Sequence, residues 1–367
     1  MIVKSIELYN FRNYKDLKIA FDDGVNIFYG NNAQGKTNLL EALYFSSTTK
    51  SYRNCKDKDL IRFGENEAHI KSVIERKSAD FIIDFHLKEF EKKGIAINKV
   101  PIKKASELLG LCNMVFFSPE DLGIIKQGPS MRRRFLDMEI GQADVVYLDS
   151  LSNYKRALNQ RNSLLKGNHQ TWDFENILEV LDTKIAEYGR KIINIREKFI
   201  KELNIIIKDI HSNMTKNKED IVVIYEKDVS SDLFERKLKA NLERDMRLGT
   251  TGAGPHRDDL SFIVNGIDIR YFGSQGQQRT AALSLKLAEI EFLKKITKDK
   301  PVLLLDDVLS ELDKERQRNL LDSISDIQTF ITCTGVEDFI KKKFDIDKLY
   351  HVENGDVLID SGGMYGF

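Results

Sequence analysis

At 367 residues the chain exceeds the size at which a single hydrophobic core usually stops growing, so two lobes are expected. Apolar residues make up 41% and charged residues 31%, which is typical of a globular protein with a charge-rich surface. The net charge of zero excludes a uniformly basic surface, although it leaves room for a basic stripe that is offset by acidity elsewhere.

Neither a membrane span nor a secretion signal is expected. No stretch approaches the roughly 20 apolar residues that a membrane span requires. The first residues alternate like a strand and lack the apolar segment and cleavage site of a signal peptide. Cys55, Cys112 and Cys333 are isolated in the sequence, so we expect reduced thiols and a cytoplasmic location.

The N-terminal part alternates short apolar runs with turns. Strands are predicted over 2–8 and 25–29, the second ending at Gly30. A helix is predicted after Thr37, because four apolar residues then share one helical face: Leu39, Leu40, Leu43 and Tyr44. From 67 to 100 the alternating runs, the clearest at 70–74 and 81–87, predict a meander of strands.

The middle of the chain reads differently. A short strand at 115–117 is followed at 118–121 by a Ser-Pro-Glu-Asp segment typical of a helix start. Between 131 and 212 there is almost no strand pattern. Apolar residues recur at three- and four-residue steps over 177–210, which predicts one helix of about forty residues, roughly 55 Å long. An earlier apolar stripe over 145–158 predicts a helix that packs against it.

Strand patterns return in the C-terminal part. Residues 262–269 predict a hairpin with an Asn265-Gly266 turn, and the unbroken apolar run 302–305 predicts a strand buried on both faces. The predicted organisation is therefore a split sheet lobe, residues 1–115 and 248–367, with a mostly helical lobe, 116–247, inserted as an arm.

One phosphate-binding motif is present, and it lies between the predicted strand at 25–29 and the following helix. The segment Gly30-Asn31-Asn32-Ala33-Gln34-Gly35-Lys36-Thr37 fits the P-loop pattern. The glycines let backbone N–H groups converge on phosphate oxygens at the positive end of a helix. Lys36 is expected to contact the β- and γ-phosphates of ATP, and the Thr37 hydroxyl to bind Mg²⁺.

A P-loop needs a metal-binding carboxylate on a neighbouring strand. The apolar run 302–305 delivers Asp306 and Asp307 at its C-terminal end. We expect Asp306 to hold Mg²⁺ through a water molecule and Asp307 to orient and deprotonate the attacking water. A solvated acidic turn is the alternative interpretation of this pair.

A second anion site is predicted ahead of the helix that carries Leu283 and Leu287. Ser274, Gly276 and Gln277 precede or open this helix, where a hydroxyl and free N–H groups are available. One nucleotide held by one P-loop does not need this site from the same subunit, so a second molecule is expected to provide it. The alternative is that Ser274 serves only as a helix cap.

Taken in order, these motifs resemble the head of ABC-type ATPases. The usual five-residue signature of these heads, Leu-Ser-Gly-Gly-Gln, maps onto 273–277 and departs from it at Gly273 and Gln275. The resemblance implies that Ser310 and Asp313 belong to the D-loop, which lines a dimer interface in this family. It implies an α/β fold, with a mixed sheet, flanking helices and an antiparallel β subregion, and an inserted helical lobe.

Four further blocks resemble the RecF family of bacterial recombination mediators: Asn10–Tyr14, Phe117–Leu122, Arg132–Asp137 and Gly254–Leu260. This resemblance implies ATP-driven homodimerisation, nucleoid-associated binding to double-stranded DNA near gaps or junctions, and cooperation with RecR, and indirectly RecO, in loading RecA. An SMC-like DNA tether and an ABC-type transport ATPase subunit are the alternatives. The short arm disfavours the tether, and the inserted helices and RecF-like blocks disfavour the transporter.

The same resemblance implies roles for single residues. Arg12 and Asn38 are expected near the nucleotide, residues 118–121 at the Q-loop, and residues 332–334 at the switch after the acidic strand. Asp307 stands where many ABC-type heads have a glutamate, so slow hydrolysis is expected.

His256 lies in the fourth of the RecF-like blocks. Two interpretations of this residue are left open. It is either a pH-sensitive or catalytic group, or a structural hydrogen-bonding residue.

Basic clusters are the candidate DNA contacts. Lys50 and Arg53 form one cluster, and Arg132, Arg133 and Arg134 form another. Each cluster is expected either to meet phosphates or to be an ordinary solvated face. Nothing predicts base readout, so binding is expected to be independent of sequence and to weaken steeply with salt.

Overall fold

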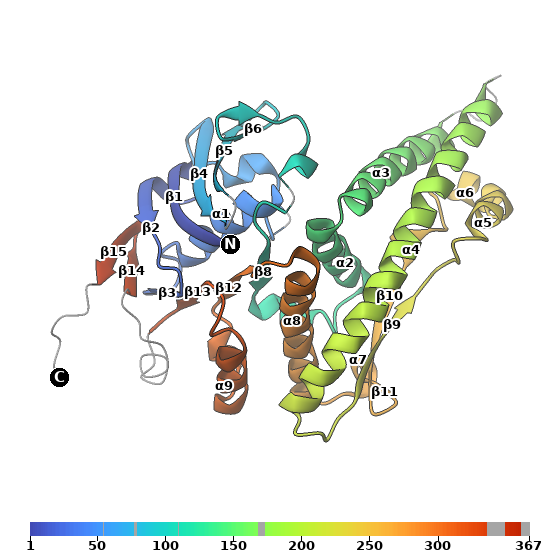
Figure 1. Cartoon of the computed structure of the whole chain (residues 1–367). Helices are drawn as coiled ribbons and strands as arrows, with labels where there is room; N and C mark the ends of the chain where they lie inside the picture. The colour runs from blue at the N-terminus through green and yellow to red at the C-terminus, as the bar shows by residue number, and fades with distance from the viewer. Residues whose placement is uncertain (54, 77–78, 109, 168–172, 336–348, 361–367) are drawn as a thin grey trace. The chain divides into compact units, whose positions relative to one another are not determined.

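The computed structural model describes residues 1–53, 55–76, 79–108, 110–167, 173–335 and 349–360 (Figure 1). The chain divides into two compact units. The head unit comprises Met1–Asp121 and Glu289–Phe367, and the arm unit comprises Leu122–Ala288. The predicted boundaries, 115 and 248, differ from these mainly at the second, because residues 248–288 belong to the arm unit.

A largely parallel sheet of the head unit contains the strand that precedes the P-loop. Its strand order is β15-β14-β3-β13-β12-β8. Only the β14–β15 pairing is antiparallel. The bounds are Val25–Tyr29 for β3, Met114–Phe117 for β8, Val302–Asp306 for β12, Thr329–Cys333 for β13, Leu349–Glu353 for β14 and Asp356–Asp360 for β15. Every residue of β12 is buried, as its apolar sequence predicts.

The second sheet of the head unit is antiparallel and has the order β2-β1-β4-β5-β6-β7. Its strands are Ile2–Phe11, Tyr14–Ala20, Glu67–Glu75, Asp80–Lys88, Gly94–Ile97 and Val100–Pro101, taken as β1, β2, β4, β5, β6 and β7. Helix α1, Lys36–Thr48, contacts strands of both sheets, including β4 and β12. The predicted strands at 2–8, 70–74 and 81–87 are confirmed.

Short helical segments complete the head unit. They are η1 (Asp57–Leu60), η2 (Ala105–Glu107), η5 (Leu309–Glu311) and α9 (Lys314–Ser323), with η3 (Pro119–Gly123) at the boundary between the units. The helix start predicted at 118–121 is a single turn, in which the backbone N–H and hydroxyl of Ser118 donate to the Asp121 carboxylate at 2.8 and 3.1 Å. Within the described ranges, no helix is both long and apolar enough to cross a membrane.

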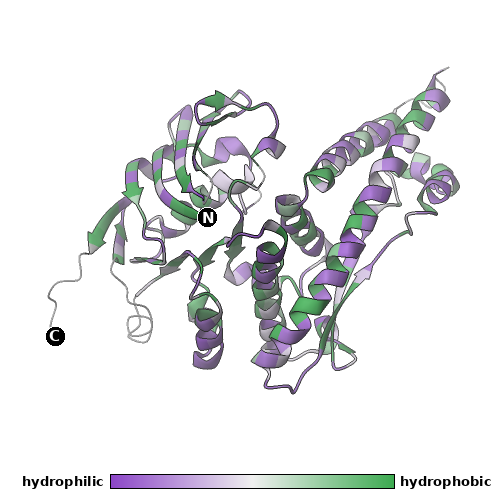
Figure 2. Ribbon diagram, in the orientation of Figure 1, coloured by the Kyte–Doolittle hydropathy of each residue, from purple (hydrophilic) through white to green (hydrophobic). Residues whose placement is uncertain are grey.

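The arm unit is built around one long helix. Helix α4 spans Phe174–Met214, 41 residues, and confirms the helix predicted from the apolar stripe. Helix α3, Val145–Lys166, packs along it (Figure 1), and apolar residues of α4 gather on one side of the helix (Figure 2). The other helices are α2 (Pro129–Ala143), α5 (Phe234–Ala240), α6 (Leu242–Leu248), α7 (Ile269–Phe272) and η4 (Pro255–Arg257), and α8 (Gln275–Thr297) leads back into the head unit.

A small antiparallel sheet of order β11-β10-β9 explains the position of the second boundary. Strand β9, Ile221–Glu226, pairs with β10, Asp259–Val264, and therefore holds the segment after 248 in the arm unit. The predicted hairpin is confirmed. Strand β11, Ile267–Asp268, follows a turn in which Asn265 and Gly266 have φ values of 49° and 81°.

The outer edge of β9 is covered by a side chain. Asn204 of α4 donates to the Val223 carbonyl and accepts from the Val223 N–H, both at 2.8 Å. One amide therefore replaces the backbone pairing that a further strand would give. Exposed strand edges invite pairing with other chains, and this contact blocks the edge at its centre.

Candidate functional site

The P-loop depends on glycine at two positions. Gly30 follows β3 with φ +148°, and Gly35 precedes α1 with φ +119°, both outside the range that side chains readily adopt. A Cβ atom at Gly30 would lie 2.4 Å from the Val352 carbonyl oxygen, and one at Gly35 would lie 2.5 Å from the Asn13 amide nitrogen. Close packing of the loop against its neighbours therefore excludes larger residues.

Neighbouring segments also hold the loop through hydrogen bonds. The Asn13 amide and the Gly355 N–H donate to the Gln34 carbonyl at 2.9 and 3.1 Å. The Tyr14 hydroxyl donates to the Gly35 carbonyl at 2.9 Å. Carbonyls engaged in this way point away from the inside of the loop, which favours inward N–H groups and a phosphate-binding cradle.

Lys36 is folded back onto the loop. Its ammonium group donates to the Gly30 and Asn31 carbonyls at 2.7 and 2.8 Å. Burial lowers the pKa of Lys36, and the nearby Asp307 carboxylate acts in the opposite direction. The predicted cation of the site is therefore present at the mouth of the loop.

Thr37 and Asp306 come together as predicted. The Thr37 hydroxyl donates to the Asp306 carboxylate at 2.8 Å, and the Thr332 hydroxyl donates to the same oxygen at 2.8 Å. Burial raises the pKa of Asp306, and these two hydrogen bonds oppose the shift. A hydroxyl beside a carboxylate is the kind of hard oxygen donor set that Mg²⁺ takes together with phosphates.

Asp307 lies at the end of β12 in an uncommon backbone conformation. Its φ is 53°, and its N–H donates to the Thr332 carbonyl and hydroxyl oxygens at 3.2 and 3.0 Å. The Ser310 hydroxyl donates to the Asp307 carbonyl at 2.7 Å. These contacts fix the backbone at Asp307, and the Ser310 hydroxyl also lies 3.3 Å from its half-buried carboxylate. Asp313 caps α9, since its carboxylate accepts from the Arg316 N–H at 3.0 Å.

Arg12 lies in the turn between β1 and β2, with φ 53°. Its guanidinium makes a two-pronged contact with the Glu41 carboxylate at 2.9 and 3.0 Å and donates to the Asp59 carbonyl at 2.7 Å. The side chain lines an open hollow of about 810 Å³ beside the P-loop helix. The hollow is further lined by Asn13, Asn38, Arg53, Lys58, Asp59, Ile61, Arg62, Phe63, Gly64, Glu65, Asn66 and Glu89.

Arg53 also belongs to this region. Its guanidinium donates to the Tyr52 hydroxyl at 3.0 Å and to the Asn38 side-chain oxygen at 3.1 Å. The Tyr52 hydroxyl lies 3.5 Å from Asp306. The structure thus brings Arg53 next to the P-loop helix and Asp306, the candidate nucleotide site, whereas Lys50 is exposed and stays a predicted DNA contact.

In the arm unit, Ser274 is the N-terminal cap of α8. Its hydroxyl accepts from the Gln277 N–H at 3.2 Å, while its own N–H donates to the Gln277 side chain at 3.0 Å, a reciprocal capping box. Ser274 is exposed, and Gly276 lies in the first turn of the helix. The capping role is thus observed, and the predicted role in a second subunit stays a prediction.

The predicted DNA contact at Arg132 is not supported, because this side chain is buried. Its guanidinium pairs with the Asp259 carboxylate at 2.6 and 3.0 Å, and it donates to the Gln127 carbonyl at 2.5 Å. Arg133 is half-buried and donates to the Asp258 carbonyl at 2.8 Å. Arg134 is also half-buried, and both Arg133 and Arg134 stay predicted DNA contacts.

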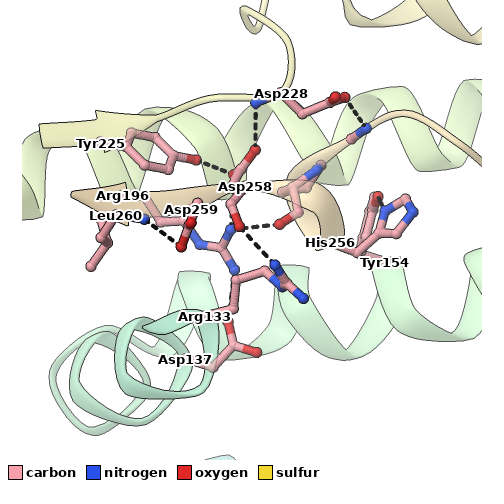
Figure 3. A network of polar contacts seen from close by, with 12 residues as sticks. Arg133, Asp137, Tyr154, Arg196, Tyr225, Asp228, His256, Asp258, Asp259 and Leu260 are labelled. Carbon is pink, nitrogen blue, oxygen red and sulfur yellow. Dashed lines mark hydrogen bonds and ion pairs between the residues drawn. The ribbon is translucent and has the colours of Figure 1, made fainter. Parts of the chain in front are cut away.

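His256 has the contacts of a structural residue (Figure 3). Its Nε2 lies 3.0 Å from the Thr251 carbonyl, which can only accept, so Nε2 carries the proton. The Nδ1 atom then accepts from the Tyr154 hydroxyl at 2.7 Å. Burial lowers the pKa of His256 and favours this neutral form.

A larger ionic cluster adjoins His256 in the arm unit (Figure 3). It joins Arg196 to Asp137 and Asp258, each at 2.9 Å. Of the two interpretations of His256 left open by the sequence, these surroundings favour the structural one.

Several contributors to the site were missed by sequence reasoning. Glu41 is fully buried in α1, but it lies outside the apolar face of Leu39, Leu40, Leu43 and Tyr44, so the sequence carried no signal for it. Tyr52 carried none. Asn13 and Tyr14 lie in a RecF-like block, but their contacts with the P-loop cross 21 residues of sequence and leave no local pattern.

The fold and the site together define an ABC-type ATPase head, which confirms the predicted fold class. The profile of the family described as "RecF/RecN/SMC N terminal domain" matches residues 2–357. A relative from Agathobacter rectalis, named DNA replication and repair protein RecF, is 56% identical over 359 residues, covering 98% of this chain and 99% of the relative.

Solved structures support the same family assignment. The structure described as the recombination mediator protein RecF-ATP in the RecFOR pathway has a TM-score of 0.90 at 37% identity, covering 98% of this chain and 97% of that chain. A Smc head domain from Pyrococcus furiosus, at 18% identity and a TM-score of 0.56, covers 98% of this chain and 96% of that chain and shares the fold. The chain belongs to the RecF family of DNA replication and repair proteins.

Proposed function

We propose that this protein is an ATP-switched DNA-binding protein of recombinational repair. ATP joins two copies, the joined copies bind duplex DNA near gaps or junctions, and slow hydrolysis releases them. The observation that carries this proposal is the constellation of Lys36, Thr37, Asp306 and Asp307 around one P-loop. The similarity to a protein described as RecF-ATP supports ATP as the nucleotide.

The residues of the head unit have separate tasks in this proposal. Lys36 exchanges its loop carbonyls for phosphate oxygens, and the loop N–H groups bind the phosphates. Thr37 and Asp306 are the residues that would hold Mg²⁺, and the positive charge of the bound ion would offset the negative charge of the phosphates. Asp307 orients the attacking water and accepts its proton. Its carboxylate is one methylene shorter than a glutamate, which favours slow turnover.

Ser274 gives the proposal its two-subunit character. The chain carries one P-loop and one signature segment, and Ser274 is exposed at the start of a 23-residue helix. A helix N-terminus attracts anions through its dipole and its free N–H groups. We therefore assign Ser274, Gly276 and Gln277 to the γ-phosphate held by a second copy, with Ser310 and Asp313 of the D-loop at the same interface.

DNA and protein partners follow from the family. The named relative is a DNA replication and repair protein, and the similar structure is placed in the RecFOR pathway. We assign to this chain sequence-independent binding of double-stranded DNA and cooperation with RecR, and indirectly with RecO and RecA. Lys50, Arg133 and Arg134 remain the candidate phosphate contacts in the DNA.

Gel filtration with and without ATP tests the switch. The wild type is expected to dimerise only with ATP, and Lys36→Met is expected to stay monomeric. At the signature, Ser274→Asp keeps a good helix cap but places a negative charge against the γ-phosphate, whereas Ser274→Asn keeps the cap without the charge. The proposal requires that the aspartate variant loses the dimer and that the asparagine variant largely keeps it.

If both Ser274 variants dimerise like the wild type, Ser274 does not act in a second subunit. DNA binding is tested separately with a salt series on duplex DNA with ATP, with ADP and without nucleotide. Binding is expected to require ATP and to fall steeply with salt. Binding that ignores both nucleotide and salt would contradict the DNA part of the proposal.

A further inference from the structure

Glu41 is a fully buried carboxylate within the P-loop helix, five residues beyond Lys36. One of its oxygens accepts from Arg12 at 3.0 Å and from the Ser51 hydroxyl at 2.5 Å. The other accepts from Arg12 at 2.9 Å and lies 3.7 Å from the Arg53 guanidinium. Three side chains from two separate segments therefore converge on one carboxylate that has no place in the P-loop pattern.

The carboxylate is what allows the two arginines to be neighbours. Arg12 comes from the turn after β1 and Arg53 from the segment after α1, and two guanidinium groups at this distance from one oxygen repel each other. Glu41 compensates that repulsion. Burial opposes the charge of Arg12, but the Glu41 contact outweighs it and raises the Arg12 pKa above its ordinary value.

Both arginines line the open hollow of about 810 Å³. Asn38, the first residue after the P-loop pattern, lines it as well and is held by Arg53 and Asn13. The hollow therefore begins where the phosphate cradle ends. If the β- and γ-phosphates of a nucleotide lie in the P-loop, the hollow is the adjoining space that can take its nucleoside part.

We propose that Glu41 is a positioning residue that holds Arg12 and Arg53 at the wall of this hollow, where they contact the nucleoside end of ATP. The inference rests on the proposed function, since it needs ATP in the P-loop. ATP then has two kinds of contact with the protein. The loop and Lys36 bind its phosphates, and Arg12 and Arg53 bind its nucleoside end. Loss of the Glu41 charge weakens only the second kind.

Calorimetric titration of the full chain with ATP and with inorganic tripolyphosphate, both with Mg²⁺, tests this separation. Glu41→Gln keeps the shape of the side chain and removes its charge. Its dissociation constant for ATP is expected to rise at least about tenfold, because hydrogen bonds between charged groups are strong. Its dissociation constant for tripolyphosphate is expected to stay within about twofold of the wild-type value.

Asp245→Asn is the matched control, since Asp245 is also fully buried and pairs with a buried arginine, Arg161, at 2.7 Å. It lies in the arm unit and is expected to bind both ligands like the wild type. Arg53→Gln covers the case in which Glu41→Gln does not fold. Arg53 is exposed, so its loss is expected to leave the melting temperature unchanged and to weaken ATP alone.

The possible outcomes separate the explanations. Equal weakening of ATP and tripolyphosphate in the Glu41 variant would overturn the inference, because Glu41 would then shape the P-loop. An ATP affinity within twofold of the wild type in either Glu41→Gln or Arg53→Gln would also overturn it. A loss of ATP affinity in Asp245→Asn as large as that in Glu41→Gln would indicate a general effect of destabilisation. If the wild type binds no ATP, the proposed function itself is wrong, and this inference falls with it.

Discussion

Both units bury charged side chains, but they surround them differently. In the arm unit, Arg132, Arg161 and Arg196 are each at most 2% exposed, and each pairs with one or two carboxylates of the same unit. In the head unit, Lys36 is held by backbone carbonyls at the mouth of a loop, and Glu41 holds two arginines that line an open hollow.

The difference separates two uses of buried charge. An arginine whose partners are carboxylates in the same core fixes the helices that carry it, and its removal leaves those carboxylates unpaired. A charge that is held at the rim of a loop or hollow still has free directions toward a ligand. The comparison predicts large stability effects with little change in nucleotide binding in the arm unit, and the reverse in the head unit.

Asp307→Asn is expected to give the largest effect. The variant cannot accept a proton from water, so ATP turnover is expected to fall by about 10²- to 10⁴-fold. ATP affinity is expected to stay the same, because Lys36 and Thr37 are intact, and the ATP-bound dimer should persist longer. Phosphate release and gel filtration measure the two effects. Asp322→Asn, an exposed change on α9, is the control. A turnover within threefold of the wild type would remove Asp307 from the catalytic role.

Arg196→Ala is expected to be next, and it acts on stability. It leaves the buried Asp258 and the partly buried Asp137 without their arginine, which costs about 3–5 kcal/mol. Hydrogen exchange of the α4 amides reports the loss in the arm unit. Arg190→Ala, which removes an exposed pair with Glu235, is expected to cost less than about 1 kcal/mol. A similar effect of the two substitutions would mean that the buried cluster is not what holds α4.

Asn204→Ala is expected to have a smaller and more local effect. It leaves the Val223 N–H and carbonyl without their amide partner, which costs about 1–3 kcal/mol. Faster exchange of the Val223 amide and a greater tendency to aggregate through the β9 edge are expected, and light scattering measures the second. Asn176→Ala, an exposed change on the same helix, is the control. Unchanged exchange at Val223 would show that the edge is protected by other means.

The pH dependence that His256 contributes is expected to be the smallest effect. Burial holds its folded-state pKa below the ordinary value, so the unfolded chain binds a proton first as the pH falls. Stability is then lost below about pH 6.5 and levels off below the folded-state pKa. Melting temperatures between pH 7.5 and 5 should fall less for His256→Gln than for the wild type. Burial also lowers the pKa of His211, so part of the slope should remain. Parallel curves for the two proteins would contradict this prediction.

Local patterns predicted most of the fold. The apolar stripe of α4, the buried run of β12 and the Asn-Gly turn each depend on neighbouring residues, and each is observed. The boundary at 248 differed because the β9–β10 pairing joins strands that are separated by more than thirty residues along the chain. No periodicity within either strand reveals which partner it takes.

For the site, too, local motifs could be predicted and contacts between distant segments could not. Lys36, Thr37 and Asp306 were predicted because their spacing within a motif carries the chemistry. Arg132 was predicted to contact DNA, but it pairs with Asp259, which is 127 residues away. A run of three arginines has the same sequence whether its side chains face solvent or a buried carboxylate. Glu41 was missed as well, because its partners Arg12 and Ser51 lie 29 and 10 residues away and no motif links them to it.

The position of β3 in its sheet also constrains how the protein is made. Its neighbours, β13 and β14, come from the last part of the chain, and the turn after β14 reaches back to Gln34 through Gly355. The P-loop is translated early, but the strands that support it leave the ribosome much later. A chain that ends before β13 and β14 therefore lacks the contacts that shape the loop, and we expect it not to bind nucleotide.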